Sequence, residues 1–473
     1  MVGITSFGAY IPLFRLDKKV IRGKGEKAIC NFDEDSVTMA VEAISDCLKG
    51  AKRDTVDALY FGTTTSVYKE HSGATTIAMA SNFREDAYTA EFGGSLRAGT
   101  AALKAGIDAV KAGSAKTAMI AAADCRMGVP GTSLEQNFGD GAAAFLIGDT
   151  DVAAEIVAEY SVYSEIMDLW RIDADRFVSN WEDRFVVEQG YLPTMGKAIT
   201  GIMAKYNYKP SDFAKVIFYS GADQRRCAEL AKALKFDAQK QLQNPMMENI
   251  GDTGSASVPM LLAAALEEAK KDDLILVASY GNGADAFVFR VTEHIEKIRG
   301  KSLGINKHLA SKRIMTNYMK YLEWRALLPT GNTAGPHAAY SAVAAKREYH
   351  KSIGLYGSKC KACGYVQYPP QRVCTHCQTK DQMEPYSFVD RIGKIFTYNL
   401  DYITPRVEVP TVTVEVDFEG GGRIQCYLTE VDVDRVAIDV PVVMTFRRNR
   451  LWEQIGLREG VYIYFWEAKP LRA

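Results

Sequence analysis

The chain has 473 residues, more than one hydrophobic core usually organises, so we expect two or three domains. Its apolar and charged fractions, 47% and 24%, are those of an ordinary soluble globular protein, and its formal net charge of −1 excludes a global field that would attract nucleic acid or an anionic membrane. No apolar stretch approaches the ~20 residues of a membrane span, and the first residues lack the pattern of a secretory signal. Five cysteines occur singly, which favours a reducing cytoplasm over a disulfide framework: Cys30, Cys47, Cys125, Cys227 and Cys426.

The N-terminal part alternates apolar strand patterns with helical patterns, which is typical of an α/β domain. A glycine turn that opens a buried strand occurs twice, as Gly139–Ile147 and as Gly281–Phe289. Each copy follows a strand, a long alanine-rich helix and a second strand, at residues 56–62, 93–111 and 117–122 and again at residues 215–219, 255–271 and 274–279. One unit used twice predicts a pseudo-two-fold α/β architecture, which we place at residues 1–295.

The character of the sequence changes after Thr292. Residues 296–350 are basic and helical in pattern, with a Pro/Gly interruption at Leu328–Pro336, and we expect a linker that carries two helices. A cysteine-rich segment follows at residues 351–385. Residues 386–473 then predict a small β-barrel, an OB-fold, from five short alternating strands at 394–402, 409–418, 423–428, 442–447 and 461–467.

Four cysteines in the segment 351–385 have metal-ligand spacing. Cys360 and Cys363 form one C-x2-C pair, and Cys374 and Cys377 form another ten residues later. Two such pairs supply the four thiolates of a tetrahedral zinc site, with no position left open for a substrate. We therefore expect a structural zinc ion in a zinc ribbon, with His376 as a bystander, and the alternatives are iron or four unrelated thiols.

Several stretches of the α/β part resemble the thiolase-fold 3-hydroxy-3-methylglutaryl-CoA (HMG-CoA) synthases, especially the archaeal type: Gly8–Pro12, Asp33–Ala40, Asp168–Arg171 and Lys209–Phe213. Gly251–Ser257 adds a similarity to β-ketoacyl-ACP synthase III. The C-terminal part resembles the zinc-ribbon and OB-fold proteins that accompany thiolase-like enzymes as separate subunits, and here the two are fused. The resemblance implies a duplicated thiolase-like αβαβα fold, an acyl-CoA substrate that brings its own coenzyme A, and a homodimer.

Carried over residue by residue, the resemblance indicates a replaced catalytic set. The family's nucleophilic cysteine lies at the N-terminus of the first buried helix, and its position falls on Glu91 in the run Asp86–Gly94. The family's histidine falls on Tyr219, its asparagine on Asp252 and its acid/base glutamate on Thr64. All four positions depart from the family pattern.

The histidine content points the same way. No histidine lies between His71 and His294, so acyl transfer through a Cys–His pair is not expected. A carboxylate at a helix N-terminus suits a general base, so we expect Glu91 to be the base, Tyr219 an acid or oxyanion donor, and Asp252 their proton partner. Other interpretations stay open: Glu91 as a charge-compensating cap in a dead site, Tyr219 as a packed aromatic residue, and Asp252 as a helix cap.

The phosphates of CoA require cations, and the candidates are Arg97, Arg171 and Lys197, each of which is otherwise an ordinary surface charge. Ser257 joins them from the stretch that resembles β-ketoacyl-ACP synthase III.

We therefore expect a cytoplasmic enzyme that forms or cleaves a carbon–carbon bond on an acyl-CoA thioester, in an aldol or retro-aldol manner, without a cysteine nucleophile. The alternatives are a decarboxylase or acyltransferase of the same fold, an HMG-CoA synthase proper if the position assigned to Glu91 is shifted, and a non-catalytic acyl-CoA-binding scaffold. No nucleic-acid or membrane partner is expected.

Overall fold

The structure is a computed structural model that describes residues 1–473 apart from 220–224, 329–340, 405–406, 450–461 and 473. The chain divides into two compact units. The first consists of Met1–Cys30, Asp35–Ala78 and Phe83–Tyr318, and the second of Asn31–Glu34, Met79–Asn82 and Met319–Ala473. None of the described helices has the length and apolar character that crossing a membrane requires.

A nine-stranded sheet forms the centre of the first unit, in the order β11-β12-β13-β8-β1-β7-β6-β4-β5. Its strands are β1 (Gly3–Tyr10), β4 (Ala58–Gly62), β5 (Tyr88–Phe92), β6 (Ala118–Asp124), β7 (Gly141–Gly148), β8 (Ala154–Tyr163), β11 (Lys215–Phe218), β12 (Leu274–Tyr280) and β13 (Gly283–Val291).

The order and direction of the strands are repeated on the two sides of the boundary between β1 and β8. On one side, β4 runs parallel to β6, and β6 antiparallel to β7. On the other side, β11 runs parallel to β12, and β12 antiparallel to β13. The predicted repeat is therefore confirmed, and both glycine turns precede a buried strand, as the sequence indicated.

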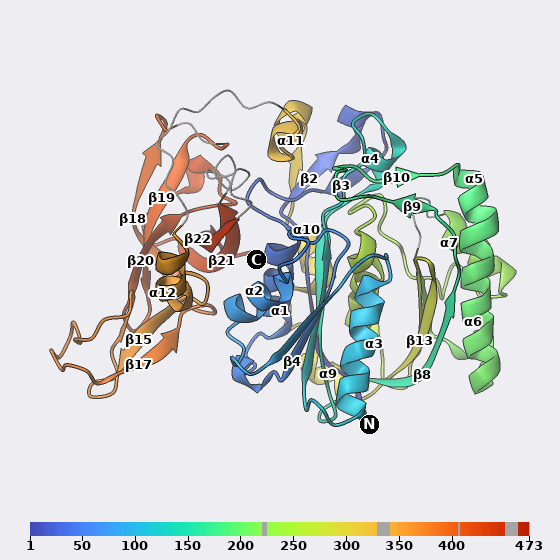
Figure 1. The fold of residues 1–473 in the computed structure, drawn as a ribbon, viewed down its shortest axis with the longest axis horizontal. Helices are drawn as coiled ribbons and strands as arrows, with labels where there is room; N and C mark the ends of the chain where they lie inside the picture. Colours follow the sequence, from blue (N-terminus) through green and yellow to red (C-terminus); the bar gives the residue numbers. More distant parts are fainter. Residues whose placement is uncertain (220–224, 329–340, 405–406, 450–461, 473) are drawn as a thin grey trace. The chain divides into compact units, whose positions relative to one another are not determined.

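Helices lie between and outside the two halves of the sheet. Figure 1 shows α3 (Ala98–Lys111) between β4 and β8, with α1 (Ser36–Cys47) beyond β4 and α6 (Leu192–Tyr206) beyond β8. The second central helix, α8 (Ser257–Glu268), is buried from Ser257 to Leu266, because alanine, leucine and other small or apolar residues occupy its whole circumference. A Cβ on Gly99 of α3 would lie 2.2 Å from the carbonyl oxygen of Ser255, so this close approach requires a glycine.

Shorter elements complete the first unit. They are β2 (Phe14–Asp17), β3 (Glu26–Ala28), α2 (Gly73–Ala80), α4 (Ser133–Asn137), β9 (Leu169–Trp170), β10 (Ser179–Asn180), α5 (Asp183–Phe185), a π-helical turn (Val186–Tyr191), α7 (Arg225–Ala233), α9 (Ile295–Ile298), α10 (Gly304–Ala310) and β14 (Arg313–Met315).

The linker expected over residues 296–350 does not begin where we placed it. α10 packs on β1 and α8 with Ile305 and His308 buried, and β14 pairs with β2. Residues up to Tyr318 consequently belong to the first unit, because their apolar side chains complete its core. α11 (Tyr318–Trp324) and α12 (Ala342–Ser352) follow, and most of the Pro/Gly interruption lies outside the described residues.

The second unit contains two small sheets. One has the order β16-β15-β17 and consists of β15 (Tyr356–Cys360), β16 (Val366–Gln367) and β17 (Met383–Ser387). The other has the order β20-β19-β18-β21-β22 and consists of β18 (Ile392–Asp401), β19 (Thr411–Phe418), β20 (Arg423–Tyr427), β21 (Pro441–Asn449) and β22 (Ile463–Pro470). A bridge between Leu428 and Ala468 nearly closes these five strands, as expected for an OB-type barrel.

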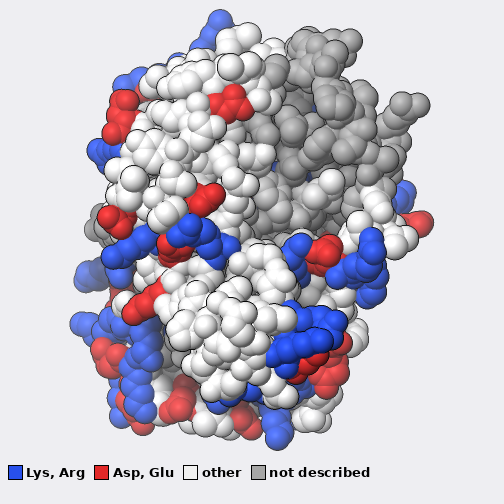
Figure 2. Space-filling model, turned by 90° about the vertical axis from the view of Figure 1, so that its left-hand side faces the viewer, with Lys and Arg blue, Asp and Glu red and all other residues white. Residues whose placement is uncertain are grey.

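Charges of both signs are mixed on one face of the molecule. Figure 2 shows one face on which lysine and arginine side chains are interspersed with aspartate and glutamate and separated by neutral areas. This mixture accords with the formal net charge of −1.

Candidate functional site

A pocket with a volume of about 870 Å³ lies in the first unit, where the parallel strands β4 and β5 end. We call it the strand-end pocket. The residues that line it are 64, 66–72, 91, 93–96, 126, 168–173, 175, 178, 281 and 282. Ligands of α/β proteins commonly bind at the carboxyl ends of strands, because the loops that follow are free to carry functional side chains.

Glu91 lines the strand-end pocket, but it is not at the N-terminus of the first buried helix, where we expected it. It lies within β5, opposite Phe61 of β4, and α3 begins only at Ala98. Its Oε2 accepts a hydrogen bond from the N–H of Gly73 at 2.6 Å and from Ser72 Oγ at 3.4 Å. Gly73 is the first residue of α2, so a different helix supplies the positive end of a dipole to this carboxylate.

The N-terminus of α3 is formed by Ser95, Leu96 and Arg97 instead. Ser95 Oγ donates to the carbonyl of Gly281 at 2.9 Å and accepts from the N–H of Arg97 at 3.3 Å. None of these residues is a cysteine, and none of the described residues that line the strand-end pocket is a cysteine. Glu91 thus does not lie at the N-terminus of α3, and the residues that do lie there include no cysteine.

The structure brings Tyr219 and Asp252 together. The hydroxyl of Tyr219 donates to Oδ2 of Asp252 at 2.8 Å, and Asp252 Oδ1 accepts from the N–H of Gly254 at 2.9 Å. Both side chains are buried, and neither is among the described residues that line the strand-end pocket. The structure therefore separates this pair from Glu91 rather than directing all three groups into one cavity.

Arg126 joins the buried pair to the pocket. Its Nη2 donates to the same Oδ2 of Asp252 at 2.6 Å, and its guanidinium lies 4.2 Å from the ring centroid of Phe138. Although its side chain is only 3% exposed, Arg126 lines the strand-end pocket. Burial and the adjacent Asp252 raise the pKa of Tyr219 well above its usual range, so the phenol stays protonated and donates.

Asp124 ends β6 close to this group and is fully buried. Its carboxylate accepts from Thr63 Oγ1, from the N–H and Oγ1 of Thr64, from Thr65 Oγ1 and from the N–H of Ser255, at 2.7–3.0 Å. Thr64, at the position of the family's acid/base glutamate, is thus a hydrogen-bond donor to Asp124. Hydrogen-bond donors therefore surround both oxygens of the Asp124 carboxylate.

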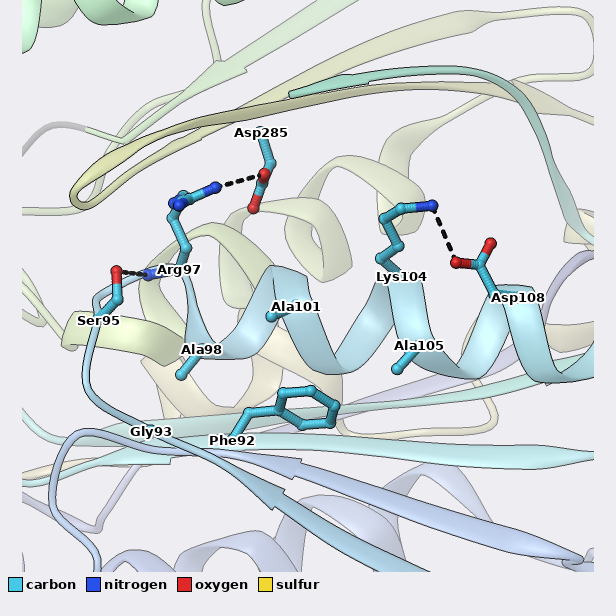
Figure 3. Close-up of a pocket in the computed structure, with 10 residues that line it drawn as sticks. All are labelled: Phe92, Gly93, Ser95, Arg97, Ala98, Ala101, Lys104, Ala105, Asp108 and Asp285. Atoms are coloured by element: carbon cyan, nitrogen blue, oxygen red, sulfur yellow. Dashed lines mark hydrogen bonds and ion pairs between the residues drawn. The ribbon is translucent and has the colours of Figure 1, made fainter. Parts of the chain in front are cut away.

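Arg97, a candidate for CoA phosphate binding, lines a second pocket of about 360 Å³ beside α3. Figure 3 shows its guanidinium directed at Asp285, with the Lys104–Asp108 ion pair further along the helix. Nη1 of Arg97 lies 2.8 Å from Asp285 Oδ1, and Nε donates to the carbonyl of Gly281 at 2.6 Å. These bonds hold the start of α3 against the β12–β13 turn, so the structure gives Arg97 an internal partner.

The other three CoA candidates are not brought together. Arg171 lines the strand-end pocket, is exposed, and donates from Nη2 to the carbonyl of Thr64 at 2.8 Å. Lys197 is exposed on α6 and lies outside the described lining of both pockets, and Ser257 is buried at the start of α8. Of the set, Arg171 alone lies in the pocket that contains Glu91.

Sequence reasoning missed Arg126, Asp124 and His71. His71 lines the strand-end pocket and contacts Tyr68 edge-on, with ring centroids 5.3 Å apart. We used His71 only to bound a histidine-free interval. A usable signal existed for the other two residues, because Asp124 and Arg126 are charged residues at the end of an apolar strand, a place where functional side chains gather.

Four of the cysteines in the second unit, Cys360, Cys363, Cys374 and Cys377, form a cluster that fits one metal ion. Their sulfur atoms all lie within 4.8 Å of one another, with Cys360 and Cys377 3.7 Å apart and Cys363 and Cys374 3.6 Å apart. Tetrahedral zinc with Zn–S bonds of about 2.3 Å places its sulfur atoms at about this separation. His376 stacks on Tyr365 and is not part of the cluster.

Profiles of known families match three parts of the chain. Residues 203–291 match the C-terminal part of 3-oxoacyl-[acyl-carrier-protein] synthase III. Residues 351–384 match the rubredoxin-like zinc ribbon domain of ChsH2, and residues 386–447 match its C-terminal OB-fold domain. The zinc ribbon and the OB-fold are therefore both present in this chain.

Solved structures show the fold of the first unit. The chain is similar to MvaS in complex with 3-hydroxy-3-methylglutaryl coenzyme A, with a TM-score of 0.61, 17% identity and coverage of 72% of this chain and 94% of that one. It is also similar to 3-oxoacyl-[acyl-carrier-protein] synthase III from Aquifex aeolicus, with a TM-score of 0.54, 20% identity and coverage of 61% and 100%. The duplicated thiolase-like fold is confirmed.

Sequence relatives identify the family to which the chain belongs. It is 32% identical over 345 residues to a hydroxymethylglutaryl-CoA synthase of Pyrobaculum arsenaticum, which covers 69% of this chain and 98% of the relative. The corresponding enzyme of Methanocaldococcus jannaschii is 32% identical over 344 residues, with coverage of 69% and 99%. That of Archaeoglobus fulgidus is 34% identical over 314 residues, with coverage of 63% and 91%. The chain is a member of the hydroxymethylglutaryl-CoA synthase family, fused to a zinc ribbon and an OB-fold.

Proposed function

We propose that this protein forms or cleaves a carbon–carbon bond on an acyl-CoA thioester, in an aldol or retro-aldol manner, without a cysteine nucleophile. The observation that carries the proposal is the content of the strand-end pocket. In a chain of the hydroxymethylglutaryl-CoA synthase family, the N-terminus of α3 bears no cysteine, whereas Glu91 lines the pocket. Enolate chemistry needs a base at the substrate α-carbon and no covalent acyl-enzyme.

Glu91 is the base in this proposal. The N–H of Gly73 and the N-terminus of α2 stabilise its ionised form, which is the form that accepts a proton. Both of its hydrogen bonds use Oε2, and we assign Oε1 to the substrate proton. Tyr219 and Asp252, which we expected as direct proton partners, are buried behind Arg126, so proton transfer at the substrate is assigned to Glu91 alone.

The zinc ion, in this proposal, is structural. Four thiolates complete its coordination, so the metal would hold the ribbon together and leave the chemistry to the first unit. We also propose a cytoplasmic homodimer. None of the nine cysteines is in a disulfide bond, and β5 is an edge strand of the nine-stranded sheet, where a second subunit can cover the unpaired backbone. Acyl-CoA is the proposed small-molecule partner, with Arg171 as the proposed phosphate contact.

The test combines turnover with protein mass. The wild-type protein and Glu91→Gln are incubated with acetyl-CoA and acetoacetyl-CoA, and separately with 3-hydroxyacyl-CoA thioesters. We expect an aldol or retro-aldol product, no acyl adduct in the intact protein mass, and a loss of about 10²-fold or more in rate for Glu91→Gln. Glu165→Gln, an exposed carboxylate outside the described lining of the pocket, is the matched control.

Two results point elsewhere. Release of CO2 without an aldehyde or ketone product indicates a decarboxylase, and a stable acyl adduct indicates an acyltransferase. The hydrogen bond from Gly73 to Glu91 favours a second candidate, a non-catalytic acyl-CoA-binding scaffold in which Glu91 compensates the α2 dipole. That candidate predicts binding of CoA esters with no turnover, and binding that is unchanged in Glu91→Gln.

A further inference from the structure

We infer that Arg126 is a catalytic residue that donates a hydrogen bond to the thioester oxygen of the substrate as this oxygen gains negative charge, and that Tyr219 and Asp252 are positioning residues that act through Arg126. The inference rests on the proposed function and deepens it. It assigns a role to a buried charged group that sequence reasoning overlooked.

Arg126 follows β6 by two residues and lines the strand-end pocket. It lies where the parallel strands β4, β5 and β6 end, as Glu91 does. Within the described part of the chain, Arg126 is the member of the buried group that reaches this lining, because Tyr219 and Asp252 do not. An effect of the pair on a substrate in the pocket therefore passes through the guanidinium.

Hydrogen bonds fix the guanidinium. Asp252 Oδ2 accepts from Arg126 at 2.6 Å and from Tyr219 at 2.8 Å, so the tyrosine orients the carboxylate that in turn orients the arginine. The ring of Phe138 lies against the guanidinium and restricts it from another side. A donor that is held in place before the reaction stabilises a developing charge without further reorganisation.

The local charge indicates which substrate group Arg126 contacts. Asp252 already neutralises it, and Asp124 adds a buried negative charge that hydrogen-bond donors satisfy. A substrate carboxylate would add a full anion to a group that is not cationic overall. A thioester oxygen is neutral in the ground state and becomes negative only in the enolate, so the hydrogen bond strengthens in the transition state.

The step conserves atoms and electrons. The α-carbon loses one proton to Glu91, the C–H electron pair forms the carbon–carbon double bond of the enolate, and the carbonyl π pair moves onto the thioester oxygen next to Arg126. The enolate carbon then attacks the carbonyl carbon of the second substrate, the carbonyl π pair of that substrate becomes an alkoxide, and Glu91 returns its proton to this alkoxide, which restores the carboxylate. Retro-aldol cleavage is the same sequence in reverse. No oxidant or reductant is needed.

The enolate of acetoacetyl-CoA absorbs in the near ultraviolet, so its formation on the protein is measured without turnover. We expect wild-type protein to raise the enolate fraction of bound acetoacetyl-CoA, and Arg126→Lys to lower the enolate–ketone equilibrium constant about tenfold or more. Tyr219→Phe lowers it severalfold and shifts its pH profile to higher pH. Arg290→Met, which removes an exposed arginine of β13, leaves the equilibrium unchanged.

Glu91→Gln separates this inference from the proposed function. It slows the approach to the enolate equilibrium, and because the α-proton then passes to solvent, the enolate fraction of this variant rises with pH, with Arg126 still present to stabilise the enolate. If Glu91→Gln changes neither, the assignment of the base is wrong, and the inference on Arg126 stands on its own variants.

Because Arg126→Lys can disturb a buried pair, the double variant Arg126→Met/Asp252→Asn is measured in parallel. It removes both charges of the ion pair, so that Asp252 is not left as an unpaired carboxylate. An enolate fraction equal to that of wild type in both variants overturns the inference, as does a wild-type protein that produces no enolate. If these variants lose affinity for malonyl-CoA but keep their affinity for acetyl-CoA, the inference is also overturned, because Arg126 would then recognise a carboxylate.

Discussion

Replacement of Arg126 by methionine removes the cation from a buried ion pair and leaves a shorter, unbranched apolar side chain. The side chains of Arg126 and Asp252 are 3% and 1% exposed, so the variant contains an uncompensated buried carboxylate. Removal of one partner from such a pair costs about 3–5 kcal/mol of unfolding free energy. Asp252 keeps the Tyr219 hydroxyl and the Gly254 N–H as donors, so we expect the lower end of this range, about 3 kcal/mol.

The assay must report the first unit by itself, because a chain of two units does not unfold in one step. Hydrogen exchange followed by mass spectrometry gives the opening free energy of peptides from β6 and α8. Arg126→Met/Asp252→Asn should be more stable than Arg126→Met alone, since Asp252 is then no longer an unpaired buried charge. A loss below about 1 kcal/mol for Arg126→Met, the value of an exposed pair, would refute the reasoning.

Three further predictions concern other parts of the molecule. Metal analysis should find one zinc ion per chain, and Cys363→Ser should abolish binding and increase hydrogen exchange in β15 and β17, because the four thiolates and the metal hold these strands together. Gly99→Ala should destabilise the first unit by about 1–3 kcal/mol, because its Cβ meets a backbone carbonyl, whereas Gly196→Ala, which has open space, should be neutral or slightly stabilising. Burial raises the pKa of Asp33 from 3.8 to about 6, so its contribution to stability is full below pH 3.8 and lost as pH rises through about 6. Exchange in β21 should show this loss in the wild type, and Asp33→Asn should remove it.

Each of these predictions has a clear contrary outcome. A metal-free ribbon with unchanged exchange in Cys363→Ser contradicts the structural role of zinc. Equal stability of the Gly99 and Gly196 variants contradicts the close contact between α3 and Ser255. If hydrogen exchange in β21 depends on pH in the same way in the wild type and in Asp33→Asn, the assignment of the titration to Asp33 is contradicted.

Local patterns predicted the architecture well. The two glycine turns before β7 and β13 mark the repeat, because a turn and the buried strand after it are determined by neighbouring residues. The spacing of Cys360, Cys363, Cys374 and Cys377 likewise fixes a metal cluster within one short segment. Such features need no information on distant parts of the chain.

The candidate site was less predictable, because it depends on contacts between distant segments. The helix expected from residue 93 begins at Ala98, because Gly93–Arg97 forms the turn after β5. Glu91 consequently lies in β5 and not at the start of the helix. Arg126 and Asp252 are 126 residues apart in sequence, and only the three-dimensional fold shows that they form an ion pair. The linker was misplaced for a similar reason, because the burial of Ile305 depends on β1 and α8.

The central claim is that Glu91 removes an α-proton from an acyl-CoA in a pocket without a cysteine nucleophile. Exchange of the α-hydrogens of acetyl-CoA with deuterium oxide, followed by mass spectrometry, tests it most directly, because it needs neither the second substrate nor the reaction direction. We expect exchange in the wild-type protein at a rate reduced about 10²-fold or more in Glu91→Gln. Exchange that is equally fast in Glu91→Gln, or that requires a covalent acyl-enzyme, contradicts the claim.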